Sequence, residues 1–397
     1  MQLDESRKTV ASIIGRAVNN IKALVLEDIA TMRVRDVPDP TISPEYVVLG
    51  VQAVGVCGTD LHLFQGHNNY RIDSQGRPIP LKVQPQILGH EFSGEVLEVG
   101  REVKDLRPGD RILCDQGLNC FSFGYRPLCP FCASGDSHQC AHYQEPGITG
   151  LPGAMAEYIA MPAVNCLLAA PEIPAMQVAL TEPLACVLHS CDRVDSRPGR
   201  YMFEGPERIR NILICGAGPA GLLFLQVLRN IKGFDGQILI SDVRDRNLEL
   251  AREFGGTPIN AARQNLTNTV KELTANEGIH YLIEACGRGE VFEQMPALLR
   301  KQATVLLYGQ GHKGNLGVLS NVLFLEPHFV SAIGASGGFD SNGRPTIYRR
   351  SLEVIISGKV KVMPLITHKY MSFEEVPRAF EHDFVREDYV KGVLVRD

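Results

Sequence analysis

Hydrophobic residues in the first part of the chain occur in short runs that are separated by turn residues. Runs of this kind cover residues 23–26, 46–51 and 94–100, and an Arg-Pro-Gly-Asp sequence at 107–110 is typical of a turn. Short apolar runs between turns are the pattern of antiparallel strands. The sequence therefore predicts a β-rich, barrel-like region between residue 21 and about residue 180.

From about residue 211 the pattern changes to an apolar strand, a glycine-rich turn, a helix and a second strand. The strands are expected at 212–215 and 237–240 with the helix at 219–231 between them, and further apolar strands follow at 281–285 and 304–308. This alternation predicts a parallel α/β unit.

The last part of the chain returns to isolated elements, a helical segment at 348–356 and an apolar strand at 389–395. We expect both to rejoin the β-rich region. A chain of 397 residues is also longer than a single hydrophobic core usually supports, so two domains are expected.

The charge balance argues against a polyanionic partner. The chain has 40 lysines and arginines against 45 aspartates and glutamates, a formal charge of −5, and a net negative field repels nucleic acid. No run of 18 apolar residues is present, and Asp4 and Glu5 stand where a secretory signal needs positive charge. We therefore expect a cytoplasmic protein that binds neither nucleic acid nor a membrane.

Eleven cysteines in a cytoplasmic chain indicate metal binding or burial rather than disulfides. Four of them, Cys120, Cys129, Cys132 and Cys140, lie in one loop rich in proline and glycine, and four thiolates can fill a closed tetrahedral zinc site. The alternatives are unrelated thiols or a zinc ribbon that binds nucleic acid. The ribbon is disfavoured because Arg126 is the only arginine in the loop, which has no lysine.

The clearest cofactor motif is a glycine turn between the first strand and the helix of the α/β unit. It consists of Gly216, Ala217, Gly218, Pro219, Ala220 and Gly221. Asp242 ends the next strand, where a carboxylate can accept hydrogen bonds from an adenosine ribose while the helix N-terminus holds a pyrophosphate. We expect a Rossmann site that prefers NAD to NADP. Arg244 and Arg246 weaken that preference without reversing it, and an ordinary glycine turn is the alternative.

A third group of candidates is dispersed along the chain: Cys57, His90 and Glu182. One thiolate, one imidazole and one carboxylate leave a zinc ion with an open coordination position, as a Lewis-acid catalyst needs. From the residues alone, a histidine such as His90 is more often structural, and Glu182 before Pro183 is more often an acid at a helix N-terminus.

The sequences around these residues form longer motifs: Val-Cys-Gly-Thr-Asp-Leu-His at 56–62, Leu-Gly-His-Glu-Phe-Ser-Gly at 88–94, Thr-Glu-Pro-Leu at 181–184 and Pro-Leu-Ile-Thr-His at 364–368. Together with the glycine turn and the cysteine loop, they resemble the zinc-dependent medium-chain dehydrogenase/reductase family, in particular its polyol (sorbitol) and threonine dehydrogenase branch. The resemblance implies a GroES-like catalytic domain that a Rossmann domain interrupts. The implied segments are an N-terminal extension at 1–20, the catalytic domain at 21–192 and 336–397, and the NAD-binding domain at 193–335.

The resemblance also implies metal-binding roles. Cys57, His90 and Glu182 match the ligands of a catalytic zinc, and Glu91 is a neighbouring carboxylate that approaches or ligates the metal in some family members. With a structural zinc in the cysteine loop, two zinc ions per chain are expected.

Three residues near Cys57 match groups that assist the reaction in the family. Thr59 matches a hydroxyl that relays the substrate proton, and His62 matches the group that passes this proton to solvent. Asp60 is expected to orient His90 by accepting its second ring N–H.

The implied activity is hydride transfer between NAD and a secondary alcohol of a polyol or a sugar-like substrate, because a glutamate at 182 replaces a second catalytic cysteine. L-Threonine or another alcohol is the alternative substrate. A non-catalytic protein that binds NAD and zinc is the alternative class, which an open zinc position disfavours. A homo-oligomer, a dimer or a tetramer, is expected.

Two departures from the family pattern affect the site. Cys120 and Cys129 are eight residues apart in place of the usual two, so the cysteine loop is enlarged. The interval between Cys57 and His90 is also long, and it carries His67, Tyr70, Arg71 and Arg77 in a loop expected near the mouth of the active site. The sequence therefore leaves the substrate open.

Overall fold

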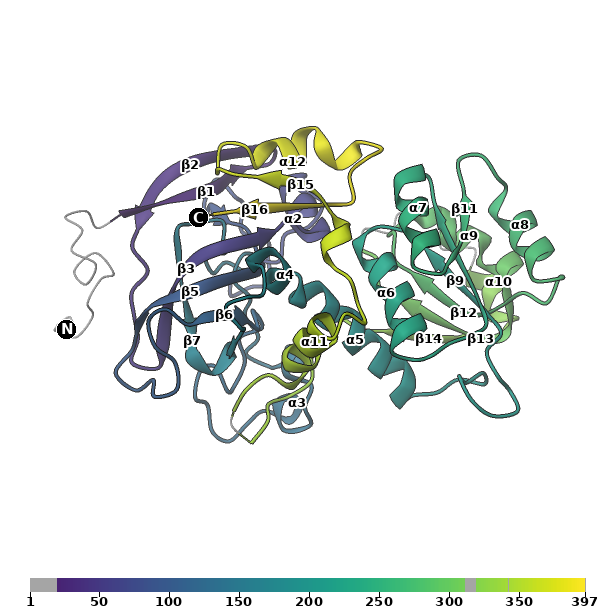
Figure 1. Ribbon diagram of the computed structural model, residues 1–397, viewed down its shortest axis with the longest axis horizontal. Helices are drawn as coiled ribbons and strands as arrows, with labels where there is room; N and C mark the ends of the chain where they lie inside the picture. The colour runs from purple at the N-terminus through teal and green to yellow at the C-terminus, as the bar shows by residue number, and fades with distance from the viewer. Residues whose placement is uncertain (1–19, 311–318, 342, 397) are drawn as a thin grey trace.

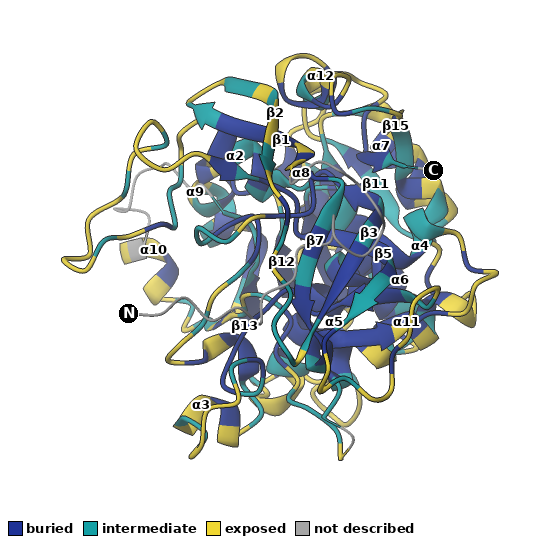
Figure 2. Ribbon diagram, turned by 90° about the vertical axis from the view of Figure 1, so that its left-hand side faces the viewer, coloured by how far each residue is buried: buried dark blue, intermediate teal, exposed yellow. Residues whose placement is uncertain are grey.

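The computed structural model describes residues 20–310, 319–341 and 343–396, so nearly all of the extension predicted at 1–20 lies outside the described residues. Figure 1 shows a β-rich domain that contains both the first and the last strands of the chain, beside a second domain formed by the middle of the sequence. Buried residues follow the strands and the long helix α5 (Thr181–Ser196), whereas the exposed residues gather in loops (Figure 2).

Among the described residues of the β-rich domain, seven strands form the main sheet, in the order β15-β16-β3-β5-β6-β8 with β7 paired to β3. A second sheet has the order β2-β1-β4. The strands are β1 (Asn20–Asp28), β2 (Thr31–Pro38), β3 (Tyr46–Gly55), β4 (Gln86–Ile87), β5 (Glu91–Val99), β6 (Arg111–Cys114), β7 (Tyr158–Pro162), β8 (Cys166–Leu168), β15 (Ile366–Tyr370) and β16 (Lys391–Val395). The helices are α2 (Gly58–Phe64), α3 (Pro130–Ala133), α4 (Ala175–Ala179), α5, α11 (Thr346–Ile356) and α12 (Pro377–Glu381).

The last strand of the chain lies inside the main sheet. β16 pairs antiparallel with β3, so that Val393 lies opposite Gly55, and Gly55 lies opposite Glu91 of β5 on its other side. The C-terminal segment is therefore part of the same sheet that carries the region of His90 and Glu91.

The second domain is a parallel sheet with helices, and the described strands follow the order β11-β10-β9-β12-β13-β14. The strands are β9 (Asn211–Cys215), β10 (Gln237–Asp242), β11 (Thr257–Asn260), β12 (Ile279–Glu284), β13 (Leu299–Leu307) and β14 (His328–Ser331), and the helices are α6 (Pro219–Asn230), α7 (Asp245–Glu253), α8 (Leu266–Leu273), α9 (Gly289–Leu298) and α10 (Leu319–Leu323). Numbered along the chain, this order is 3-2-1-4-5-6, the Rossmann arrangement, in which ligands bind at the carboxyl ends of the strands where the order reverses. The predicted fold class is confirmed, and the strand order reverses between β9 and β12.

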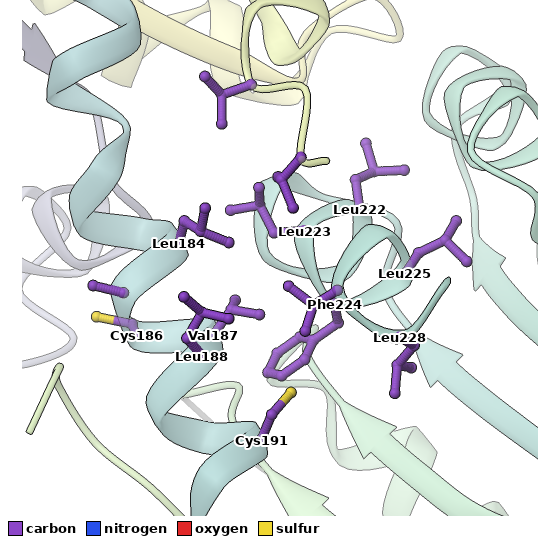
Figure 3. Close-up of a cluster of buried hydrophobic side chains, with 14 of the residues drawn as sticks. Leu184, Cys186, Val187, Leu188, Cys191, Leu222, Leu223, Phe224, Leu225 and Leu228 are labelled. Carbon is purple, nitrogen blue, oxygen red and sulfur yellow. The ribbon is translucent and has the colours of Figure 1, made fainter. Parts of the chain in front are cut away.

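Helices α5 and α6 pack against each other where the domains meet. Figure 3 shows apolar side chains of α5, including Leu184, Val187 and Leu188, pointing toward Leu223 and Phe224 of α6. All five of these side chains are completely buried, and burial of such side chains contributes roughly 1.5–3 kcal/mol each. This contact anchors the glycine turn, which precedes α6, beside α5, whose first turn contains Glu182.

Candidate active site

The structure gathers three of the predicted side chains at one point. Ligand atoms of Cys57, His90 and Glu91 all lie within 4.8 Å of one another. Cys57 precedes α2, while His90 directly precedes β5 and Glu91 is the first residue of that strand. Burial lowers the pKa of His90, but the negative charges of Asp60 and Cys57 outweigh burial and raise this pKa well above its usual value. Charges that favour a proton on His90 also favour a metal cation, so the donor set fits zinc.

Asp60 holds the two ligand segments in place. Its completely buried carboxylate accepts the backbone N–H of Cys57 at 2.9 Å and that of Gly89 at 3.4 Å. The Nδ1 atom of His90 lies 3.4 Å from Asp60 Oδ1. A proton on Nδ1, facing Asp60, leaves Nε2 free as a metal ligand.

Glu91 is compensated by a lysine that sequence analysis did not single out. Lys391, at the start of β16, places its Nζ atom 2.6 Å from the Glu91 carboxylate, and both side chains are buried. Burial lowers the pKa of Lys391, but the charge of Glu91 outweighs it and raises the pKa. The lysine therefore remains a cation that pairs with Glu91 beside Cys57 and His90.

Glu182 is close to this group without belonging to it. Its Oε1 atom accepts Gln116 Nε2 at 2.8 Å and the thiol of Cys186 at 3.3 Å. Burial raises the pKa of Glu182 to about 7, against the opposing effect of the positive charge of His90. A cation bound beside His90 would favour the ionised carboxylate, so Glu182 can complete a ligand set.

The predicted relay residues follow Cys57 on α2. Thr59 and His62 are three residues apart and therefore share a face of the helix. The Nδ1 atom of His62 is buried without a hydrogen-bond partner, and burial, followed by the influence of His67, lowers the pKa of His62. A neutral ring with a free nitrogen can accept a proton.

The glycine turn fits a dinucleotide. Gly216 has a φ of +101°, and a Cβ at Gly221 would lie 1.8 Å from the carbonyl oxygen of Gly216, whereas a Cβ at Gly218 would meet no atom within 4 Å. Gly216 and Gly221 are thus required for the turn and for packing of α6, while Gly218 faces open space where a pyrophosphate can approach. Pro219 and Ala220 begin α6 at this opening.

Asp242 lies beside the glycine turn. Its carboxylate accepts the backbone N–H of Ala217 at 2.8 Å and that of Arg244 at 3.0 Å. The guanidinium of Arg244 donates to the carbonyl of Tyr389 in the β-rich domain at 2.9 Å. Arg246, in contrast, pairs with Glu249 on α7. The carboxylate is therefore directed at the turn, with Arg244 beside it at 3.7 Å, whereas Arg246 is engaged elsewhere.

The four loop cysteines converge despite the enlarged spacing. All four sulfur atoms lie within 4.8 Å of one another, with 3.6 Å between Cys120 and Cys140 and 3.9 Å between Cys129 and Cys140. Sulfurs bound to zinc at about 2.3 Å in a tetrahedron are about 3.8 Å apart, so the group fits zinc. The backbone N–H of Cys132 and that of Ala141 lower the pKa of Cys129 to about 6, which favours the thiolate.

We expect Cys129→Ser to affect stability rather than chemistry. Losing one of four thiolates should release the loop zinc and lower Tm by roughly 5–10 °C, while turnover per folded molecule persists. Elemental analysis and thermal denaturation measure the two effects. Cys191→Ala removes a buried thiol outside both clusters and should retain both zinc ions. If Cys191→Ala lost a zinc ion while Cys129→Ser kept both, the assignment of the loop site would be wrong.

Sequence analysis missed three polar residues of the site: Gln116, Glu145 and Lys391. Lys391 carried a usable signal, because it is a single charge inside an apolar strand. Gln116 and Glu145 lie in loops without periodicity, so their proximity to Glu182 appears only in the folded chain.

Comparison with known proteins agrees with this geometry. The family described as "Alcohol dehydrogenase GroES-like domain" matches residues 43–172, and the family described as "Zinc-binding dehydrogenase" matches residues 219–351. An L-threonine 3-dehydrogenase of Pyrococcus abyssi is 30% identical over 87% of this chain and 89% of its own length. A sorbitol dehydrogenase of Bacillus subtilis is 26% identical over 91% and 93% of the two chains.

A solved structure shares the architecture of both domains. An oxidoreductase/dehydrogenase of unknown specificity from Escherichia coli superposes with a TM-score of 0.76 at 25% identity, covering 95% of this chain and 99% of its own. Fold and site define a zinc-dependent oxidoreductase with a nicotinamide cofactor. The chain belongs to the zinc-dependent medium-chain dehydrogenase family. None of its described helices has the length and apolar character needed to cross a bilayer.

Proposed function

We propose that this protein oxidises a secondary alcohol of a polyol or sugar-like substrate with NAD. The observation that carries the proposal is the clustered donor set of Cys57, His90 and Glu91, with Glu182 close by, in a protein whose second domain has the Rossmann strand order. When bound, zinc supplies Lewis-acid polarisation of the substrate hydroxyl and NAD supplies the hydride acceptor.

The residues of the chain account for the remaining chemistry. Thr59 Oγ1 would accept the proton of the substrate hydroxyl while its own hydroxyl proton passes on to His62, whose ring has an unpartnered nitrogen and can release the proton toward solvent. Asp60 keeps His90 oriented, and Lys391 fixes Glu91.

L-Threonine is the alternative substrate, favoured by the 30% identity with an L-threonine 3-dehydrogenase. The test is NAD reduction with a panel of polyols and L-threonine, before and after removal of zinc by a chelator and again after zinc is restored. We expect turnover on polyols that chelation abolishes and zinc restores. Absence of turnover on every alcohol by protein that holds two zinc ions would support a non-catalytic binding protein instead.

For the cofactor, we propose that Asp242 selects NAD. A carboxylate accepts hydrogen bonds from ribose hydroxyls but repels a 2′-phosphate. Asp242→Asn removes the charge and keeps only one of the two acceptor oxygens, and it should lower kcat/KM for NAD by roughly 10–100-fold and reduce the ratio of kcat/KM for NAD to that for NADP. Comparable kcat/KM values for NAD and NADP in the unaltered protein would contradict this proposal. They would indicate that Arg244, which lies 3.7 Å from Asp242, binds the 2′-phosphate of NADP.

We also propose a cytoplasmic homo-oligomer, either a dimer or a tetramer. All eleven cysteines are free, as expected in a reducing compartment. β14 lies at an edge of the parallel sheet, and Phe324 and Ile333 near it are 83% and 57% exposed. Exposed apolar side chains beside an edge strand are typical of an interface, and light scattering measures the resulting mass.

A further inference from the structure

Glu145 is a second carboxylate near Glu182, and no role above uses it. A tight turn fixes its backbone, because the carbonyl of Glu145 accepts the N–H of Ile148 at 3.2 Å and that of Thr149 at 3.0 Å. The N–H of Glu145 donates to Thr149 Oγ1 at 2.7 Å. The position of this half-buried side chain is therefore set by the fold rather than by a free loop.

The turn lies directly against the metal-binding segment. A Cβ at Gly147 would lie 2.8 Å from the carbonyl oxygen of Gly89, the residue before His90. The same carbonyl accepts the N–H of Ala154 at 2.8 Å, which ties the chain after the turn to Gly89 as well. Glu145 thus belongs to the layer that covers His90.

One buried amide connects Glu145 to Glu182. The Nε2 atom of Gln116 donates to Glu182 at 2.8 Å and to Glu145 at 3.0 Å, so the two accepting oxygens lie within about 6 Å of each other. The Oε1 atom of Gln116 accepts the hydroxyl of buried Tyr348 on α11, which fixes the orientation of the amide. Two carboxylates are therefore held together beside the site.

The carboxylate of Glu145 faces hydrogen-bond donors, Gln116 and the phenol of Tyr143, rather than an ion-pair partner. Glu91 has Lys391, whereas the ion pairs found among the described residues include none with Glu145. The negative charge of Glu145 instead adds to the effect of burial in raising the pKa of Glu182 and of Tyr70.

Tyr70 does not supply the missing compensation. Its hydroxyl donates to Gln310 at 2.7 Å and accepts from Asn68 at 2.9 Å. Gln310 follows β13, so this hydrogen bond joins the loop between Cys57 and His90 to the Rossmann domain. The hydroxyl proton of Tyr70 is donated to Gln310, so Tyr70 does not donate a hydrogen bond to Glu145.

We propose that Glu145 is a specificity-determining residue, whose carboxylate keeps substrates with a carboxylate or phosphate group out of the active site and favours uncharged polyols. This inference rests on the proposed function, since it concerns the substrate of the same zinc site. Like charges near each other in a partly buried site repel appreciably, and a hydroxyl can donate a hydrogen bond to the same carboxylate.

The test compares uncharged polyols with anions of the same length, xylitol with xylonate and sorbitol with gluconate. The zinc-loaded protein and its Glu145→Gln variant are compared, because glutamine keeps the shape and the acceptor for Gln116. We expect kcat/KM for the anion relative to the polyol to rise on the order of tenfold in Glu145→Gln. Glu145→Asp should keep the discrimination, and Glu172→Gln, the same change at an exposed position, should leave the ratio unaltered.

A binding measurement separates this inference from the proposed activity. Dissociation constants of the same four compounds are measured by calorimetry with NADH bound, which requires no turnover. If no polyol is oxidised, the proposed activity fails, yet a tenfold change in the ratio of dissociation constants still supports the role of Glu145. An unchanged ratio in Glu145→Gln, with zinc content and Tm preserved, overturns the inference whether or not polyols are oxidised.

Discussion

Replacing His90 with alanine should remove the catalytic zinc and lower kcat at least about a thousandfold. The imidazole is buried between Cys57 and Asp60, and its loss leaves two negative groups facing a gap. Zinc content should fall from two ions to one, because the cysteine loop is independent. Elemental analysis and single-turnover kinetics measure the two losses separately.

Cys57→Ala is the companion variant and should lose the same ion. His382→Ala, in which the histidine side chain is 72% exposed, is the matched control and should keep both ions and full turnover. A folded His90→Ala protein with two zinc ions and normal kcat would eliminate the proposed site.

Thr59→Ala should keep both zinc ions yet lower kcat by roughly 10²–10⁴-fold, the usual contribution of a positioned proton-transfer group. Thr59 follows Cys57 in the first turn of α2, and a threonine hydroxyl is not among the usual ligands of zinc, so metal binding and proton transfer are expected to separate at this position. Thr59→Ser retains the hydroxyl and should recover most of the activity. Full activity in Thr59→Ala would show that Thr59 does not transfer the substrate proton.

His62→Ala should have a smaller effect that depends on pH. Burial lowers the pKa of His62, so the ring is neutral and able to accept a proton near pH 7. Without the ring, the proton passes to water, and as pH rises hydroxide accepts it directly. The deficit in kcat should therefore shrink toward high pH, and a deficit that is constant across pH would place His62 outside the relay.

Much of the fold could be predicted from local pattern. The helix expected at 219–231 is Pro219–Asn230, and the strand expected at 212–215 is part of Asn211–Cys215. These elements are strongly apolar, and the glycine turn fixes their junction, so sequence pattern and tertiary packing agree. β2 (Thr31–Pro38) was not anticipated, because its alternating charged residues are those of an exposed edge strand rather than an apolar run.

Some residues of the candidate site could also be predicted from the sequence, and others could not. Cys57 and His90 could be recognised because motifs surround them, and the structure brings both to one point with Glu91. Gln116 and Glu145 could not be recognised, because a hydrogen bond between two loop residues 29 positions apart produces no periodic pattern in the sequence. Contacts that depend on loop geometry appear only when the whole chain is folded.

The position of β16 has a consequence for biosynthesis. β3 can form its antiparallel pairing with β16 only after the Rossmann domain has been translated, because Val393 pairs with Gly55 across almost the whole chain. At about 5–20 residues per second, the nascent β3 waits roughly 20 to 70 seconds for its neighbour. During this interval the edge of β3 is unpaired, and Glu91 lacks its ion pair with Lys391. The Rossmann domain can already fold at this stage. The catalytic centre is therefore the last part of the molecule to mature.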